Sequence, residues 1–345
     1  MKLSLYTIRR IRRIALISIA VALGVLFFSF LVEYKSERIL LVLSLGFLFG
    51  IPLGIFEEII FVDKFRNYSL LTIMIIKVVT YWISVMMLFG VSVFIIGRLM
   101  GADMQSYIEF FTGGDFLRGT IYILLVYDAV IVFNQYERLL GPRLAFFYAY
   151  GKYQRPERED RIFMFLDLNA STHLAETLEG ERYFGFINEF FHDITEPVLQ
   201  CSAEIYQYVG DEVVFTWKTK HGTRNANCIR LYFKIEDKIK ELSYKYKSRY
   251  NNIPRFKAGI HTGEIIASVV GDIKRELIYN GDVMNTTARI RSTCNELKKN
   301  LLISKDVFDK LENDDEIEYE DLGPVKMRGK IEPVHLYSIT GISSK

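Results

Sequence analysis

The stretch Phe163-Met-Phe-Leu-Asp-Leu168, together with Gln207-Tyr-Val-Gly-Asp-Glu212 further along the chain, directs the fold of the second half of this protein. In each stretch an apolar, strand-like run ends at an aspartate, Asp167 in the first and Asp211 in the second. Neighbouring strands that end in carboxylates offer hard oxygen ligands, which suit Mg²⁺ or Mn²⁺. A single aspartate at a strand end is commonly only solvated, so the downstream sequence has to separate these interpretations.

Strands and helices alternate around these two stretches. The order β-α-β-β-α-β is the ferredoxin-like arrangement, an α+β fold. Because many unrelated proteins share it, function has to be argued from the site. The predicted elements are a strand over 162–167, a helix near 174–191, strands near 203–207 and 212–217 joined by a turn at 209–211, a helix near 226–250, strands over 255–261, 264–269 and 275–279, a helix over 283–295 and further short elements.

Residues 1–134 have a different composition, with long apolar runs that predict an α-helical multi-pass membrane domain. A helix needs about 20 apolar residues to cross a bilayer core of about 30 Å. The exit of the first run lacks the small-x-small pattern of a cleaved signal peptide, so we interpret it as an anchor. Four spans are predicted: Ile14–Val32, Ile39–Phe56, Leu70–Ile96 and Thr120–Phe133 with its flanks.

The orientation in the membrane follows from the basic residues, which favour the cytoplasmic side. They gather before the first span, in the second loop and after the fourth span, so both termini are predicted to be cytoplasmic. The sequence thus predicts a multi-pass protein of the inner (plasma) membrane with the lipid bilayer as a partner. The basic residues are Arg9, Arg10, Arg12, Arg13, Lys64, Arg66, Arg138, Arg143, Lys152 and Arg155.

Small and ionisable residues interrupt the apolar spans. The second span contains Gly46, Gly50 and Gly54, which predict a close helix contact or a kink. Lys77 and Asp128 lie at similar depths in the third and fourth spans. An intramembrane ion pair and independent snorkelling to the interface are the two interpretations.

The remaining composition limits the partners of the soluble half. Residues 135–160 are charged and contain the breakers Gly141-Pro142 and Arg155-Pro156, which predicts a helical connector that ends before the first strand. The net charge is +2 and no basic arm is present, so no nucleic-acid partner is predicted. Three scattered cysteines without metal-ligand spacing fit a reducing cytosol.

Five segments of the soluble half resemble, in this order, the class III nucleotide cyclases. The resemblance implies that residues 161–345 form a cyclase catalytic domain of an adenylate cyclase. In such an enzyme the ribose 3′-hydroxyl of ATP attacks the α-phosphate in line, giving cyclic AMP and pyrophosphate. Any one segment is weak evidence, but the series covers almost the whole soluble half: 163–172, 207–211, 259–264, 281–289 and 325–330.

The resemblance implies a role for each matching residue. Asp167 and Asp211 would bridge two Mg²⁺ or Mn²⁺ ions per active site, with the Leu168 carbonyl as a further ligand. Backbone amides up to Thr172, at a helix N-terminus, suit the β- and γ-phosphates.

Two further groups complete the implied site. Asn285 and Arg289 are four residues apart on one helix face, where they would orient the ribose and stabilise charge at the α-phosphate. Arg328 stands in place of a family lysine that holds the terminal phosphates, and Lys330 is a second candidate. Family members draw the metals from one subunit and the Asn/Arg pair from the other, which implies a homodimer with two symmetric sites.

The base-selecting positions depart from the family. ATP-specific members usually carry a lysine and an aspartate or threonine where this chain has Gln207 and Ile278. The Gln207 amide can donate to adenine N1 and accept from its N6 amine. ATP is the predicted substrate because it is the frequent one in the family that the chain resembles. A flipped amide can read other bases, so GTP or a pyrimidine nucleotide stays an alternative. Ile278 offers only its shape and its backbone.

Two other functions are weighed against this one. Gly210-Asp211-Glu212 superficially resembles the Gly-Gly-Asp-Glu-Phe turn of diguanylate cyclases, but its flanking residues differ and that family does not use the Asn285/Arg289 pair. A membrane receptor with a decayed cyclase-like binding module is the non-enzymatic alternative, and the retained aspartates argue against it.

Overall fold

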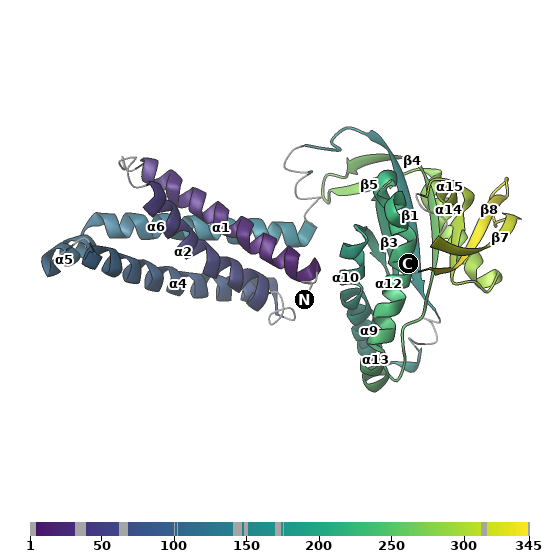
Figure 1. Cartoon of the computed structure of the whole chain (residues 1–345), viewed down its shortest axis with the longest axis horizontal. Helices are drawn as coiled ribbons and strands as arrows, with labels where there is room; N and C mark the ends of the chain where they lie inside the picture. The colour runs from purple at the N-terminus through teal and green to yellow at the C-terminus, as the bar shows by residue number, and fades with distance from the viewer. Residues whose placement is uncertain are drawn as a thin grey trace. The chain divides into compact units, whose positions relative to one another are not determined.

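The computed structural model divides into two compact units, Met1–Tyr150 and Gly151–Lys345, each with its own hydrophobic core. Figure 1 shows the first unit as a set of long helices and the second as a sheet with packed helices. The structure describes residues 5–31, 39–61, 68–99, 101, 103–140, 147, 151–169, 174, 176–311 and 316–343.

Within the described residues, the second unit is built on eight strands. They lie in the order β2-β3-β1-β4-β6-β8-β7, and β5 pairs with β4. The antiparallel core β2-β3-β1-β4 is the predicted ferredoxin-like arrangement, which is therefore confirmed. The strands are β1 (Glu157–Leu168), β2 (Glu204–Val209), β3 (Glu212–Lys218), β4 (Phe256–Val270), β5 (Glu276–Asn280), β6 (Leu301–Ser304), β7 (Ile317–Val325) and β8 (Val334–Ile342).

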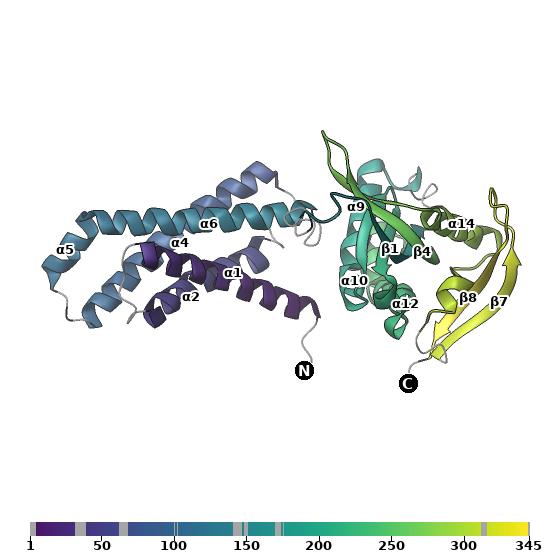
Figure 2. The same cartoon turned by 90° about the horizontal axis from the view of Figure 1, so that it is seen from above.

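Helices cover both faces of this sheet (Figures 1 and 2). On one face, alternate β1 residues such as Met164 pack against Phe190 of α9 and Ile235 of α12. On the other face, α14 lies against β4, where a Cβ on Gly259 would come within 2.4 Å of the Arg291 backbone nitrogen. The helices are α9 (Gly180–Asp193), α10 (Thr195–Gln200), α11 (Thr219–Thr223), the 3₁₀ turn η3 (Arg224–Ala226), α12 (Asn227–Glu241), α13 (Ser243–Tyr250), α14 (Asp282–Glu296) and α15 (Lys305–Phe308).

Two strand predictions are wrong in their bounds. The predicted break between strands at Thr262–Gly263 is absent, because both residues keep their ladder partners in β1 and β4 continues to Val270. The far end of β4 also pairs with the start of β1, down to Glu157 opposite Ala267. The first strand therefore starts inside the predicted connector, before its expected end at residue 160.

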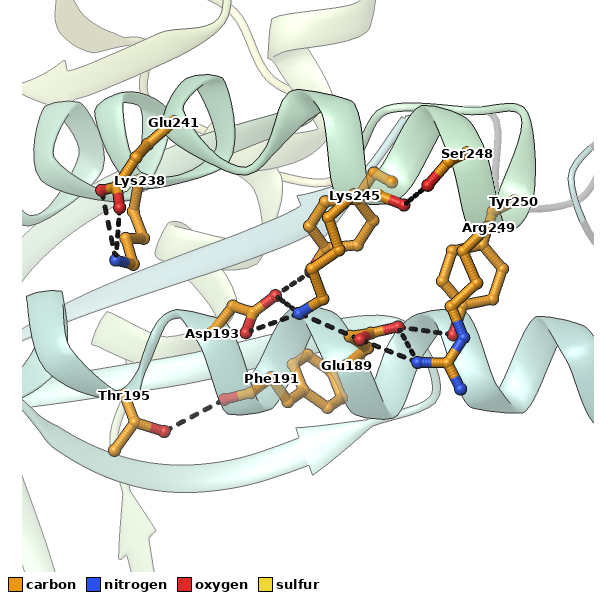
Figure 3. A network of polar contacts seen from close by, with 11 residues as sticks. Glu189, Phe191, Asp193, Thr195, Lys238, Glu241, Lys245, Ser248, Arg249 and Tyr250 are labelled. Carbon is orange, nitrogen blue, oxygen red and sulfur yellow. Dashed lines mark hydrogen bonds and ion pairs between the residues drawn. The ribbon is translucent and has the colours of Figure 1, made fainter.

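The predicted helix over 226–250 is divided at Leu242 into α12 and α13. A network of ion pairs attaches α13 to α9 (Figure 3). Lys245 Nζ lies 2.9 Å from both Glu189 Oε1 and Asp193 Oδ2, and Arg249 Nη1 lies 3.0 Å from Glu189 Oε1. These contacts set the direction of α13, so the chain turns where α12 ends.

The first unit contains long apolar helices, and three described segments are long and apolar enough to cross a membrane: Val42–Phe61, Leu71–Ile95 and Phe116–Glu137. They confirm the apolar character of the second, third and fourth predicted spans. The first span, Ile14–Val32, falls in α1 but ends outside the described residues, so it stays a prediction, as do the orientation arguments from Lys64, Arg66 and Arg143. The helices are α1 (Leu5–Leu31), α2 (Ile39–Ile55), the π-helix η2 (Phe56–Phe61), α4 (Leu70–Leu99), α5 (Met104–Thr112) and α6 (Gly114–Leu140).

The glycines of α2 allow a close approach to α1. A Cβ on Gly46 would lie 2.4 Å from Ala22 Cα, and a Cβ on Gly50 would lie 2.6 Å from Ser18 Cα. Only hydrogen fits at these positions, so the predicted close helix contact is confirmed.

The partner of Lys77 differs from the proposed one. Its Nζ lies 2.8 Å from Glu57 Oε1, and Tyr81 donates a hydrogen bond of 3.1 Å to the same oxygen. Lys77 and Glu57 are 1% and 0% exposed, whereas Asp128 lies beside the Trp82 side chain. The Lys77–Asp128 pairing is therefore wrong, because η2 continues the second helix past Phe56 and carries Glu57 into the bundle.

Candidate active site

Three carboxylates, those of Asp167, Asp211 and Glu212, form a carboxylate cluster at the ends of β1 and of the β2–β3 hairpin. Asp167 and Glu212 are directly opposite in the β1–β3 ladder, so their side chains share one face of the sheet. Asp211 follows Gly210, whose φ of +63° suits the tight turn between β2 and β3. The structure thus brings the two predicted metal aspartates together and adds Glu212.

The cluster is partly buried and electrostatically strained. Burial raises the pKa of Asp167 to about 6, the Asp211 and Glu212 carboxylates act in the same direction, and Arg291 opposes them. Burial also raises the pKa of Glu212. Within the described residues, Asp211 Oδ2 is buried without a hydrogen-bond partner. Within the described residues, no group of three or more His, Cys, Asp or Glu side chains is arranged to hold a metal ion by itself. Carboxylate oxygens are nevertheless the ligand type that Mg²⁺ or Mn²⁺ prefers, and Leu168 lies buried at the end of β1 next to Asp167.

An arginine that the sequence argument missed lies at this cluster. Arg291 Nη1 is 3.2 Å from Asp167 Oδ2, and Arg291 Nη2 is 2.6 Å from Glu212 Oε2. The signal was present in Arg289-Ile-Arg291, because residues two apart on a helix point to different sides. The consecutive acids Asp211 and Glu212 were the matching signal on the hairpin.

The other predicted residues gather at the N-terminal half of α14 and are called the α14 group: Asn285, Arg289, Arg328 and Lys330. The Arg289 guanidinium donates to the Gly329 backbone carbonyl. Lys330 Nζ lies 2.7 Å from Asp282 Oδ2. These contacts hold the loop between β7 and β8 against α14, with Asn285 and Arg328 exposed beside it.

The carboxylate cluster and the α14 group lie on different sides of α14. At about 100° per residue, Arg291 is turned some 200° from Arg289. No hydrogen bond or ion pair joins Asn285 or Arg289 to Asp167 or Asp211 in the part of the chain that the structure describes. The two groups of predicted site residues are therefore not joined by such contacts within the described part of one chain.

The base-selecting candidates are only partly brought together. Gln207 is exposed on β2. Its neighbour Tyr206 contacts Tyr279 of β5, with ring centroids 4.9 Å apart. Ile278, 38% exposed, faces the opposite way from Tyr279 because alternate strand residues do so. The structure thus places Tyr279, a residue not predicted for the site, beside the strand that carries Gln207, while Thr172 lies outside the described residues.

Comparison with known proteins agrees with this geometry. Residues 154–341 match the family described as the adenylate and guanylate cyclase catalytic domain. This chain belongs to that family, and the resemblance seen in the sequence is confirmed.

Individual relatives are similar over parts of their length. "Adenylate cyclase 2" of Rhizobium meliloti (strain 1021) is 33% identical over 220 residues, which cover 64% of this chain and 61% of that protein. "Adenylate cyclase" of Anabaena cylindrica is 22% identical over 180 residues, 51% of this chain and 36% of that protein. The chain thus spans less than two thirds of either relative.

Among solved structures, a bacterial light-regulated adenylyl cyclase superposes with a TM-score of 0.54 at 19% identity. The match covers 64% of this chain and 66% of that one. At this identity the likeness supports the fold of the second unit.

Proposed function

We propose that this protein is a membrane-bound adenylate cyclase that forms 3′,5′-cyclic AMP and pyrophosphate from ATP at two shared sites of a homodimer. The observation that carries the proposal is the arrangement on α14, where Arg291 faces the chain's own carboxylates and Asn285 and Arg289 face away. A two-fold axis can bring the α14 group of one chain to the carboxylate cluster of the other.

Each residue has a chemical task in this proposal. When bound, two Mg²⁺ or Mn²⁺ ions held by Asp167, Asp211 and the Leu168 carbonyl would supply charge for the phosphates and the attacking hydroxyl. Asn285 orients the ribose so that its 3′-oxygen lies in line with the α-phosphate. Arg289 stabilises the negative charge that develops as the new P–O bond forms and pyrophosphate leaves.

Arg328 and Lys330 bind the terminal phosphates, and backbone amides up to Thr172 are further donors. Lys330 Nζ lies 2.7 Å from Asp282 Oδ2, so a phosphate that binds Lys330 would replace one anionic partner by another. Asp282 and Arg289 thereby keep the loop that carries both cations close to α14 before substrate arrives.

The choice of ATP rests on Gln207 and on the names of the two relatives above. An amide has both the donor and the acceptor that the adenine edge requires. GTP or a pyrimidine nucleotide is the alternative, since a flipped amide presents the opposite pattern. Product identification by mass spectrometry with all four nucleoside triphosphates and Mn²⁺ decides between them.

The proposed membrane location is supported by the three apolar spans and the predicted first one. The distribution of basic residues supports a cytoplasmic position of both termini and of the second unit at the inner (plasma) membrane. Fractionation of cells that produce the full chain, followed by protease accessibility of a C-terminal tag, tests the location. A tag that is cleaved from outside intact cells would contradict it.

Subunit complementation tests the shared site. Asp211→Ala and Arg289→Ala chains with different tags are co-expressed and the heterodimer is isolated by sequential purification. Each variant alone should be inactive, whereas the heterodimer should regain activity, because one of its two sites keeps every residue. Verified heterodimers without activity would overturn the shared-site arrangement.

A further inference from the structure

The guanidinium of Arg291 occupies the position in the carboxylate cluster where a cation is needed. Building on the proposed metal site, we infer that Arg291 is an internal counter-ion that competes with the divalent ions for Asp167 and so sets the metal affinity of the site. The same carboxylates would then be neutralised either by the Arg291 guanidinium or by a bound metal ion.

The packing of α14 fixes Arg291 in this position. Gly259, in the strand next to β1, leaves room for the α14 backbone to approach the sheet at Arg291. Ile290 and Cys294, on either side of Arg291 in the sequence, are fully buried and anchor the helix. The packing of α14 therefore fixes the backbone of Arg291 within reach of the carboxylate cluster.

The charges of the cluster require a cation. Asp167 and Glu212 are like charges directly across a ladder, an arrangement that destabilises a sheet. The planar fork of Arg291 reaches both carboxylates at once, with distances of 3.2 and 2.6 Å. Without a metal, this one guanidinium offsets the repulsion that two carboxylates would otherwise exert.

The same contacts leave Arg291 exchangeable. In the described part of the chain, Arg291 Nε and Asp211 Oδ2 are buried without hydrogen-bond partners, so the arginine does not saturate the cluster. Its side chain is 24% exposed, and that of Asp167 is 25% exposed. An ion that takes Asp167 Oδ2 must displace one arm of the guanidinium, while the arm on Glu212 can remain.

Mn²⁺ titrations without nucleotide test this competition. The full chain in detergent micelles is titrated with Mn²⁺, and free Mn²⁺ is measured by electron paramagnetic resonance for wild type, Arg291→Gln and Arg291→Lys. Arg291→Gln should bind Mn²⁺ at least about fivefold more tightly, because it removes a positive charge next to the ion. Arg291→Lys should lie between the two, because an ammonium cannot bridge both carboxylates.

The matched control is Arg158→Gln, since Arg158 forms an exposed pair with Glu264 at 3.0 Å on β1 and β4. Its Mn²⁺ affinity should stay within about twofold of wild type, because screened surface charges interact weakly. Thermal unfolding in EDTA and in Mn²⁺ gives a second readout. Arg291→Gln should have a lower Tm than wild type in EDTA and gain more from Mn²⁺, since its carboxylates then have no cation.

The outcomes separate this inference from the proposed function. Mn²⁺ affinity of Arg291→Gln equal to or weaker than wild type, in protein that melts cooperatively, overturns the competition. If Arg291→Gln does not fold, Arg291→Lys decides, and an unchanged affinity in that variant overturns it. Asp167→Ala tests the metal site itself: unaltered Mn²⁺ binding there would refute the proposed ligands, whatever the arginine variants do.

Discussion

Lys77 in the first unit and Arg291 in the second are both cations that face carboxylates, and they differ in how far their side chains are exposed to solvent. Lys77 and Glu57 are 1% and 0% exposed, and Tyr81 adds a hydrogen bond to the glutamate. Arg291 and Asp167 are 24% and 25% exposed, and the cluster keeps an unpartnered carboxylate oxygen. We call Lys77–Glu57 the sealed pair, because its two charges neutralise each other away from solvent. We call Arg291 with the carboxylate cluster the open cluster, because its solvent-accessible carboxylates can bind another cation.

This difference has an energetic basis. A sealed ion pair gains little over apolar packing, but removal of one partner leaves an uncompensated buried charge. In an open cluster water and ions can replace a lost partner, so substitutions there change binding more than folding. The first unit should therefore respond to substitution in stability and the second in activity.

The largest effect should come from Asp211→Asn in the open cluster. Activity should fall by roughly 10³-fold or more, because a ligand of both metals is lost, while the Tm should stay the same or rise. Cyclic nucleotide formation with Mn²⁺ and thermal unfolding are the measurements. Asp237→Asn, on the exposed surface of α12, is the matched control. A large loss of Tm in Asp211→Asn would contradict the expectation that substitutions in the open cluster change activity more than stability.

Lys77→Met removes the cation that lies 2.8 Å from the buried Glu57 carboxylate and should cost about 3–5 kcal/mol of stability. Unfolding of the detergent-solubilised chain measures it. Lys77→Met combined with Glu57→Gln should recover much of the loss, since the glutamate that lost Lys77 is then replaced by a neutral amide. A single variant as stable as wild type would mean that water reaches Glu57.

His261 sharpens the comparison because it is a buried titratable group whose Nδ1 lies 3.7 Å from the exposed Asp306 Oδ2. Burial lowers its pKa to about 4; Asp306 and Asp282 oppose this, and Lys330 and Lys310 add to it. A depressed pKa gives stability that is present above about pH 6.5 and is lost as the pH falls towards 4.

His261→Asn removes the titrating group but keeps an acceptor for Ser304. Between pH 7 and pH 4.5 it should lose about 2 kcal/mol less stability than wild type, as followed by urea unfolding of both proteins. His192→Asn, in which the histidine lies on the surface of α9, should follow wild type. Equal acid sensitivity in His261→Asn would show that His261 does not resist protonation.

The smallest effect should come from Gln207→Ala, outside both ion clusters. Loss of the hydrogen bonds to the base should change the ATP-to-GTP preference by about 1–2 kcal/mol, or roughly tenfold. The measurement is kcat/KM for each nucleotide, with Mn²⁺ affinity as the control that should not move. An unchanged ATP-to-GTP preference would contradict a role of Gln207 in base selection and would make Tyr279, beside the same strand, the next residue to substitute.

Local signals in the sequence were sufficient for the hairpin and its aspartates. Gly210 between two apolar runs marks the turn, and the alternation of β1 places Asp167 on the face opposite α9 and α12. The same alternation made the β2-β3-β1-β4 core predictable. The predicted break at Thr262–Gly263 was wrong. These two residues are typical of a turn, but their backbone pairs with β1 in the ladder.

Contacts that depend on docking could not be predicted in the same way. Arg291 reaches the carboxylates because α14 packs closely on Gly259. The Arg289-Ile-Arg291 pattern indicates that the two arginines lie on different sides of a helix, but it does not say which strand either side faces. Glu57 enters the bundle through the π-helix η2, whose altered register has no simple pattern. The aspartates and Lys77 were therefore found, and their respective partners Arg291 and Glu57 were missed.

In the proposed homodimer, α14 belongs to both active sites. Its Arg291 touches the metal ligands of its own chain, and Asn285 and Arg289 contact the nucleotide held by the other chain. Since α14 packs closely on the sheet at Gly259, a shift of this helix would change the positions of the metal ligands' partner Arg291 at one site and of Asn285 and Arg289 at the other. Metal loading at one site would then change nucleotide affinity at the other, which makes the two sites unequal once the first is filled.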